Sequence, residues 1–435
     1  MSTLFLLCQM ALRRRSVLSR VISLSAVLFA LSPWPHAHAT SVNAGLTLDE
    51  AIRLAEQAAP ALSAREAALR AAELRVGPAG ERPDPELVIG IDNLPVGGSD
   101  AWDWNRDDMT MRKVGLMQAL PRREKLALRR QRAEADAEKE RALLASARLG
   151  TREAVASAWI AAANAERRLA LVLTLQPQAK ALADAATAAI SAGRGSTADA
   201  VAAQQARFAL DDRIATLRLA RDQARMALAQ WLPHDAARPL EPAPNWRSIA
   251  LNPSTNPPRV ALHRDLRAYD AMTQAARTEI ALARAEKRPD WSVELAYADR
   301  GPNLPSMLSL QFRVGLPLFA GRRQNPLIAA NEAALLQLES ERDAAVREHR
   351  TLLLQQEATW RSALDRADRY EQQLLPLADE RVAAALAAYR GGSSVLQYVL
   401  NAFDAAIGQR IAYVDVLDAL GEVWAALHFA YAEEA

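Results

Sequence analysis

Two parts of the chain alternate between apolar and polar residues, which is the pattern of a β-strand with one apolar face. In residues 307–318, one face carries Leu308, Leu310, Phe312, Val314 and Leu316, and the other carries Ser309, Gln311, Arg313 and Gly315. Residues 291–299 alternate in the same way, and a weaker alternation in the first half runs through Leu87, Ile89, Ile91, Val114, Leu116 and Met111. The pattern predicts two strand pairs, one within residues 86–121 and one within residues 291–318.

Alternation over about ten residues is typical of two different structures. Membrane barrel strands show it because they face lipid on one side and water on the other. An ordinary hairpin that packs one face on helices shows it too. Taken alone, the alternation favours the ordinary hairpin.

Very long helical stretches follow each predicted strand pair. Residues 124–176 contain no proline and only one glycine, and as a helix they would extend about 80 Å at 1.5 Å per residue. The helix is predicted to resume beyond Pro177, and the second half repeats this pattern over residues 326–375 and on to Arg390. Helices of this length are unusual in globular domains and typical of coiled coils.

A shorter helix is predicted before each strand pair, over residues 46–76 and 259–287. Thr47 is a candidate N-cap for the first of them, with Glu50 three residues later as its capping-box partner. In the long stretches, Pro177 and its counterpart Pro376 are predicted to kink or restart the helices.

The two halves share their landmarks in the same order, at offsets of 197 to 206 residues. The repeated landmarks are Arg82-Pro83-Asp84 with Arg288-Pro289-Asp290, Val114-Gly115-Leu116 with Val314-Gly315-Leu316, Pro177 with Pro376, and Gly195-Ser196 with Gly392-Ser393. Such a period indicates a tandem duplication of one large unit. We predict a first repeat over residues 40–231, a linker with seven prolines over 232–258, and a second repeat over 259–435.

Residues 1–39 have the pattern of a secretory signal peptide. Four arginines precede the apolar run 21–31, and Ala37-His38-Ala39 fits a cleavage site; a retained anchor is the alternative. Removing this segment leaves 49 basic against 51 acidic residues, so the charge gives no support for nucleic-acid binding. Cys8, the only cysteine, would leave with it, which excludes a disulfide framework in the mature chain.

Four strands are too few to close a membrane barrel, for which about eight is the minimum. An open sheet in lipid would leave backbone groups without partners, at a cost of several kcal/mol each. If the strands cross a membrane, several chains must therefore share one barrel.

On these features the chain resembles the TolC family of outer-membrane factors over essentially all of residues 40–435. The segments that carry the resemblance are Leu46-Thr47-Leu48-Asp49-Glu50-Ala51-Ile52 with Ala59-Pro60, Ala283-Arg284-Ala285 with Pro289, and Tyr389-Arg390-Gly391-Gly392-Ser393-Ser394. The resemblance implies a mainly α fold with a membrane β-barrel. In it, a duplicated long-helix α-barrel subunit contributes four β-strands to a shared trimeric outer-membrane barrel of twelve strands.

The resemblance also implies a function and partners. The chain would be the outer-membrane channel of a tripartite efflux system in a Gram-negative bacterium, working with a periplasmic adaptor (membrane fusion protein) and an inner-membrane RND-type pump. Segments at Asp84-Pro85-Glu86-Leu87 and from Met109 to Lys125 are most similar to the heavy-metal (Czc/Cus-type) branch. The same fold in drug efflux or type I protein secretion is one alternative, and a soluble periplasmic coiled-coil adaptor is another.

Two sets of site residues follow from the resemblance. The expected adaptor contacts are the helix-hairpin tips, at Gly193, Gly195, Ser196 and Thr197 and at Gly391, Gly392, Ser393 and Ser394. The expected lining of a narrowed aperture is Gln397, Tyr398 and Asn401. Some family members carry two aspartates there, whereas this chain has Tyr398 and Asn401, which puts a carboxylate ring in doubt. Turn formation and helix packing are the alternative roles for these residues.

Nothing in the sequence indicates catalysis, a cofactor or a metal site. It contains no nucleophile elbow, phosphate loop or dinucleotide fingerprint. His234, His263, His349 and His428 are scattered, without a ligand partner at metal-binding spacing. Met109 and Met111 are predicted on one strand face, where a soft ion such as Cu(I) could bind, although an exposed apolar strand pair is the simpler interpretation.

Overall fold

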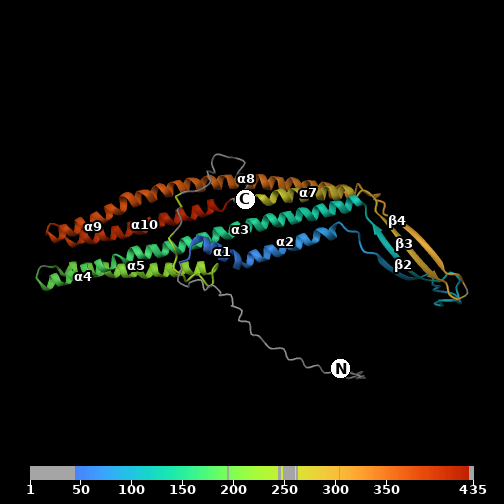
Figure 1. The fold of residues 1–435 in the computed structure, drawn as a ribbon, viewed down its shortest axis with the longest axis horizontal. Helices are drawn as coiled ribbons and strands as arrows, with labels where there is room; N and C mark the ends of the chain where they lie inside the picture. The colour runs from blue at the N-terminus through green and yellow to red at the C-terminus, as the bar shows by residue number, and fades with distance from the viewer. Residues whose placement is uncertain are drawn as a thin grey trace, which may run out of the picture. The chain divides into compact units, whose positions relative to one another are not determined.

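The computed structural model describes residues 45–430, apart from residues 194, 243–245, 248–259, 261–262 and 303. The predicted signal peptide, residues 1–39, and most of the predicted linker lie outside the described residues. Residues from Gly45 onward form one compact unit. Its long helices run side by side, and a β-sheet lies at the end opposite the α4–α5 and α9–α10 hairpins (Figure 1).

The element order repeats between the two halves. The first half contains α1 (Leu48–Ala58), α2 (Pro60–Ala79), β1 (Glu86–Asp92), β2 (Met111–Leu120), α3 (Arg123–Leu173), α4 (Gln176–Ser191) and α5 (Thr197–Ala229). The second half contains α7 (Arg267–Ala285), β3 (Trp291–Asp299), β4 (Met307–Val314), α8 (Gln324–Arg369), the π-helical turn η2 (Tyr370–Leu374), α9 (Leu375–Arg390) and α10 (Leu396–His428). Both halves thus run helix, strand pair, long helix and helical hairpin. The residue boundaries of the two repeats remain a prediction.

The helices before the strands are shorter than predicted. The expected helix 46–76 is two helices, because Ala59 is extended (φ −71°, ψ 111°), as a residue before proline prefers to be. In the second half, α7 begins at Arg267 rather than near residue 259, and residues 264–266 form a turn. Thr47 caps α1 as predicted, because its hydroxyl accepts a hydrogen bond from the Glu50 amide at 3.2 Å.

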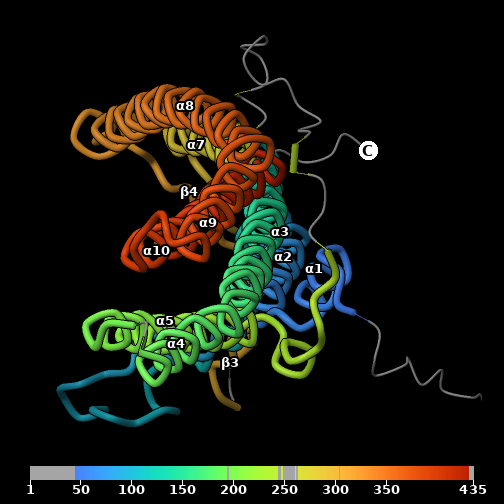
Figure 2. The backbone as a smooth tube through the Cα atoms, turned by 90° about the vertical axis from the view of Figure 1, so that its left-hand side faces the viewer, coloured from blue at the N-terminus to red at the C-terminus, as the bar shows by residue number. Residues whose placement is uncertain are grey.

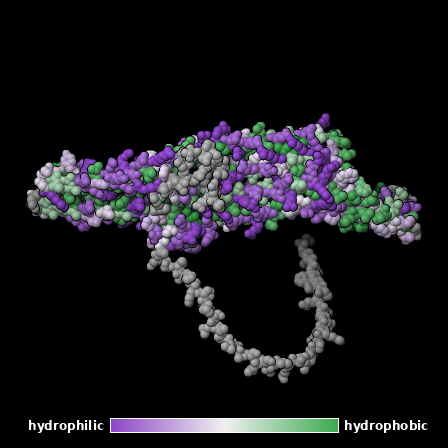
Figure 3. Space-filling model, turned by 45° about the horizontal axis from the view of Figure 1, so that its top comes forward, coloured by the Kyte–Doolittle hydropathy of each residue, from purple (hydrophilic) through white to green (hydrophobic). Residues whose placement is uncertain are grey.

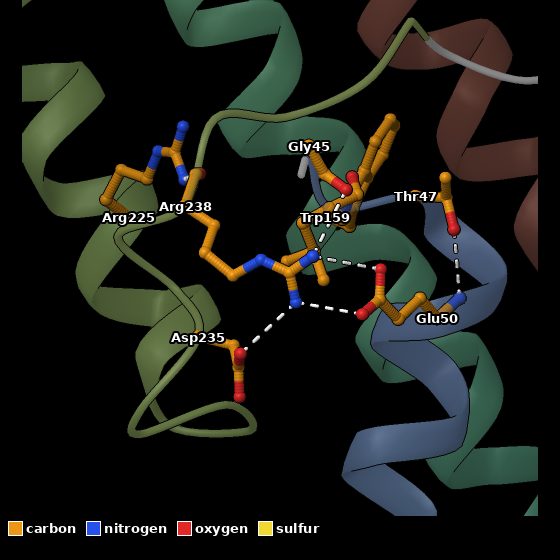
Figure 4. A network of polar contacts seen from close by, with 8 residues as sticks. Gly45, Thr47, Glu50, Trp159, Arg225, Asp235 and Arg238 are labelled. Atoms are coloured by element: carbon orange, nitrogen blue, oxygen red, sulfur yellow. Dashed lines mark hydrogen bonds and ion pairs between the residues drawn. The ribbon is translucent and has the colours of Figure 1, made fainter. Parts of the chain in front are cut away.

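Glu50 does not complete the capping box. Its carboxylate instead accepts hydrogen bonds from Arg238 at 2.9 and 3.1 Å, and Arg238 also donates to the Gly45 carbonyl (Figure 4). Beside this network, Trp159 donates its indole N–H to the Leu46 carbonyl at 3.2 Å. These contacts attach the start of the described chain to α3 and to the segment that follows α5.

The two long helices are confirmed. Helix α3 has 51 residues and α8 has 46, so they extend about 77 and 69 Å at 1.5 Å per residue. Each is interrupted at the predicted proline, but in a different way. A break at Thr174 and Leu175 precedes Pro177, whereas η2 carries α8 into α9 ahead of Pro376. Proline has no backbone N–H and cannot donate the usual helical hydrogen bond. A π-turn accommodates this missing bond and leaves the helix continuous.

The helices pack through buried clusters spaced along their length. One cluster surrounds Trp159 at the middle of the molecule and includes Ile160, Leu420 and Trp424. Smaller clusters lie within the α4–α5 hairpin and where it meets α10. Near the tips, Leu396 and Val399 of α10 share a buried cluster with alanines of α4 and α5. Figure 2 shows the α4–α5 and α9–α10 pairs end-on.

The strands form one antiparallel sheet in the order β1-β2-β3-β4. The register places Leu116 of β2 opposite Leu87 of β1 and Leu295 of β3, and Leu295 opposite Leu310 of β4. The two predicted strand pairs are therefore neighbours in a single sheet, joined by the β2–β3 pairing. Among the described residues, no helix is long and apolar enough to cross a bilayer.

Candidate membrane-facing sheet and helix-hairpin tips

One face of the sheet carries continuous rows of exposed apolar side chains, which we name the apolar face. Two rows run across all four strands: Leu87–Leu116–Leu295–Leu310 and Ile89–Val114–Tyr297–Leu308. Their side chains are between 49% and 73% exposed, although each would be buried in an ordinary packed hairpin. Figure 3 shows hydrophobic surface in this part of the molecule. The apolar face therefore has no partner within the described chain, and the ordinary hairpin interpretation is wrong.

The opposite face, named here the polar face, carries charged and small residues. Glu294 is only 1% exposed and lies between two cations, Lys113 at 3.3 Å and Arg313. Gly115 and Ala296 lie opposite each other on this face, and a Cβ at Gly115 would meet the Ala296 Cβ at 2.7 Å. The strands thus separate apolar and charged residues onto opposite faces.

Exposed aromatic residues lie at both ends of the sheet. Trp291 and Phe319, 48% and 69% exposed, lie at the end near the helices. Trp102 and Trp104, 67% and 49% exposed, lie in the β1–β2 loop at the far end. Aromatic residues at the two edges of an apolar band are typical of membrane barrels. The positions of these tryptophans and of Phe319, beside the predicted strands, are a signal that the sequence already contains.

A buried lysine holds the sheet to the helices. Lys125, 1% exposed, donates from Nζ to Asp290 at 2.8 Å, to Glu286 at 3.1 Å and to the Arg288 carbonyl at 2.9 Å. All three N–H donors of the ammonium group have partners. This contact joins the start of α3 to the segment between α7 and β3, so it connects the two halves of the chain where helices are followed by strands.

The hairpin tips contain the glycines that the sequence singled out. Gly193 and Gly392 have φ values of +67° and +73°, which favour glycine, and Gly391 is the C-cap of α9. Ser196 caps α5 by accepting hydrogen bonds from the amides of the second and third residues that follow, and Thr197 is the first residue of α5.

The second tip is capped differently. The Ser393 hydroxyl donates to the Ala388 carbonyl at 3.1 Å, and Ser394 does not cap α10. The N-cap of α10 is Val395, whose side chain cannot accept a hydrogen bond. The two tips are therefore equivalent in backbone shape but not in capping chemistry.

The three predicted aperture residues lie on the first two turns of α10 and are exposed. Gln397 donates to the Asn401 side chain at 2.8 Å, and both line a cavity of about 780 Å³ between the α4–α5 hairpin and α10. Tyr398, 66% exposed, does not line this cavity and points elsewhere on the helix. The structure thus brings Gln397 and Asn401 together and leaves Tyr398 apart from them.

The methionine prediction is wrong in its geometry. Met109 lies in the β1–β2 loop, outside β2, which begins at Met111. Met111 is three residues from Val114, an odd number, so its side chain belongs to the polar face. The two methionines therefore do not share a strand face.

The statement that the histidines are scattered is also wrong for one pair. The rings of His263 and His349 have centroids 4.1 Å apart, and Asp265 lies beside them. Burial, followed by the neighbouring His349, lowers the pKa of His263 to about 4, so this imidazole is neutral at pH 7. The sequence does contain a hint, because Asp265 follows His263 by two residues. The partner His349 depends on tertiary packing.

Comparisons with known proteins agree with this architecture. Residues 51–233 match the family model described as "Outer membrane efflux protein". No curated protein sequence matches the chain.

Several solved structures have a similar fold. The outer membrane protein VceC of Vibrio cholerae has a TM-score of 0.73 at 18% identity, covering 88% of this chain and 95% of that one. CusC, whose structures were reported in relation to transmembrane channel formation, has a TM-score of 0.74 at 16% identity, covering 88% of this chain and 92% of that one. The open state of the Neisseria gonorrhoeae MtrE outer membrane channel has a TM-score of 0.71 at 18% identity, covering 88% of each chain. The chain therefore has the mainly helical fold of these outer-membrane channel proteins, with a small sheet that a single chain leaves open.

Proposed function

We propose that the protein belongs to the outer membrane efflux protein family and forms the outer-membrane channel of a tripartite efflux system. The proposal extends the match of residues 51–233 to the whole chain. The protein conducts the substrate passively through a water-filled path, and an inner-membrane pump supplies the energy.

The observation that carries the proposal is the pair of apolar rows across all four strands. A leucine row about half exposed or more would be costly in water, at about 25 cal/mol for each Å² of apolar surface left uncovered. Lipid removes that cost. The polar face, with Lys113, Glu294 and Arg313, suits a water-filled interior.

Strand number supports a trimer. The outer strands β1 and β4 each pair on one side only, and four is an even number, so β4 of one chain can pair antiparallel with β1 of the next. Two chains would give a barrel of eight strands. The interior of a barrel of that size is filled by side chains. Three chains give twelve strands, which leaves room for a channel. We therefore propose a homotrimer in the outer membrane, with the helices extending into the periplasm.

The partners are proposed from the same reasoning. The α4–α5 and α9–α10 tips lie at the end opposite the sheet, so they face away from the outer membrane (Figure 1). A periplasmic adaptor and an RND-type pump are the proposed partners, with contacts at Gly193, Gly195, Ser196 and Thr197 and at Gly391, Gly392, Ser393 and Ser394. Gln397, Tyr398 and Asn401 are proposed to lie near the aperture.

Heavy-metal cations are the proposed substrate, on the sequence resemblance to that branch alone. The solved structures that share this fold are only 16–18% identical to the chain, so the fold alone does not identify a substrate. Drug efflux and type I protein secretion are the alternatives. A deletion strain that becomes sensitive to metal salts and not to dyes or antibiotics would support the metal substrate; the opposite pattern would contradict it.

Cell fractionation tests the channel proposal. The full chain, expressed in a Gram-negative host, should appear in the outer membrane, require detergent for extraction and give a trimer mass in native mass spectrometry. It should also raise the conductance of planar bilayers. A protein that is monomeric and soluble without detergent would contradict the proposal and favour the soluble adaptor alternative.

A further inference from the structure

We propose that His263, His349 and Asp265 form a binding site for one divalent transition-metal ion. Zn²⁺ is the ion used to test the site. The site joins the segment just before α7 to the middle of α8. It is independent of the sheet and the hairpin tips, and its test does not require transport.

Geometry supports the site. One potential ligand atom from each residue lies within 4.8 Å of the other two. Even if all three separations were that long, a central ion would be about 2.8 Å from each atom, so each ligand would move inward by about 0.7 Å to reach the ~2.1 Å of a zinc–nitrogen bond. Side-chain rotation alone covers such a distance.

The polar groups at the site are suited to a cation. The Nδ1 atom of His349 is buried and has no hydrogen-bond partner within the described chain, which is unfavourable for a polar atom. The Nδ1 atom of His263 accepts a hydrogen bond from the Asp265 amide at a long 3.3 Å and lies 3.8 Å from the Asp265 carboxylate. An ion between these groups would satisfy the buried Nδ1 atom of His349.

Neighbouring groups position the carboxylate and set the charge. Ser146 on α3 donates to one Asp265 oxygen at 2.9 Å, which leaves the other directed toward His263. Arg264 lies 3.7 Å from Asp265 but pairs with Glu153 at 2.6 Å. One arginine against two carboxylates leaves a net negative charge, which favours a cation.

The ligand set indicates the class of ion. Two imidazoles and one carboxylate suit Zn²⁺, Ni²⁺ or Cu²⁺, whereas Mg²⁺ and Ca²⁺ prefer oxygen ligands only. A bound ion would stabilise the fold by mass action, because the three ligands meet only in the folded chain. It would fix the start of the second repeat onto α8, above a small core that includes Leu266, Leu353 and Leu427.

Equilibrium dialysis of the purified full chain in detergent, without a histidine tag, tests the site. We expect one Zn²⁺ per chain, a raised melting temperature with Zn²⁺, and X-ray absorption showing imidazole nitrogen ligands. His349→Gln should weaken Zn²⁺ binding more than tenfold, and Asp265→Asn should do the same. Because Asp265 is exposed, misfolding would not explain weaker binding in Asp265→Asn. The matched control is His234→Gln, because His234 is exposed and outside the site; it should bind as the wild type does.

Two results would overturn the proposal. One is the absence of stoichiometric binding to the wild-type chain. The other is unchanged binding in both His349→Gln and Asp265→Asn, which would leave the two rings as a packing contact. Neither result would bear on whether the protein forms a channel.

Discussion

A lysine in the middle of the apolar face should be far more costly than one on the polar face. Leu116 is 52% exposed and lies near the centre of β2, in the leucine row that crosses all four strands. If this row faces lipid, Leu116→Lys should cost about 2–4 kcal/mol per chain, as for cationic residues near the bilayer midplane. If the row faces water, the same change should stay within about 0.5 kcal/mol, as for most surface substitutions.

The matched control is Gln311→Lys on the polar face. Gln311 is exposed on the polar face, so a lysine there stays in water. Guanidinium titration of protein folded in lipid vesicles, followed by tryptophan fluorescence, gives the free energy of unfolding of each variant. A cost of less than about 1 kcal/mol for Leu116→Lys, or one equal to that of Gln311→Lys, would refute the assignment of this face to lipid.

Three further predictions concern the helices. Bulky residues at Gly391 and Gly392 should abolish efflux while trimers still assemble. Gly392 has a φ of +73°, so a valine there would strain the backbone of the tip by about 1–2 kcal/mol and change its shape. A drug or metal survival assay measures the loss of efflux. Lys125→Met should lower the free energy of unfolding by about 1–3 kcal/mol, since three hydrogen bonds are lost, as guanidinium titration would measure. Glu50→Gln should reduce stability by about 1 kcal/mol at pH 7 and by progressively less as the pH falls below 4.5, as thermal melting would detect. Arg238 lowers the pKa of the Glu50 carboxyl, so the stabilisation is present above the ordinary value of 4.5 and is lost as the pH falls through the folded-state pKa.

Each of these has a control or a contradicting result. The control for the tip variants is Gly408→Ala on α10, which has open space around the added Cβ and should leave efflux intact. Normal efflux in the tip variants would contradict the proposal that the adaptor binds the tips. Arg130→Met breaks only an exposed pair with Glu134, so a stability loss equal to that of Lys125→Met would contradict the importance of burial. A Glu50→Gln deficit that does not change with pH would contradict the ion pair.

Local chemistry made much of the fold predictable from the sequence. Alternation placed the apolar residues of β3 and β4 on the correct face, because side chains alternate along a strand whatever surrounds it. Glycine marked both tips, since Gly193 and Gly392 need a backbone conformation that other residues resist. The break at Ala59 was missed, although the residue before Pro60 disfavours a helix.

Other features depended on tertiary contacts that no local pattern encodes. His263 and His349 are 86 positions apart, and they meet only because the segment before α7 packs on α8. Glu50 satisfied the pattern of a capping box, yet Arg238, far along the chain, provides its partner. The sequence gives no sign that Lys125 is buried, because its burial follows from the approach of Glu286 and Asp290.

Disulfide trapping between the outer strands tests the central claim most directly. Val88 on β1 and Met307, Ser309 and Gln311 on β4 all belong to the polar face, so pairing Val88→Cys with a cysteine at each of the three β4 positions samples three registers. Within one chain, three strand spacings of about 4.8 Å separate β1 from β4, whereas a disulfide needs Cα atoms within about 7 Å. We predict that one register gives covalent trimers in outer membranes under oxidising conditions, and that Val88→Cys alone does not. Monomers in all three registers would contradict a barrel shared between chains.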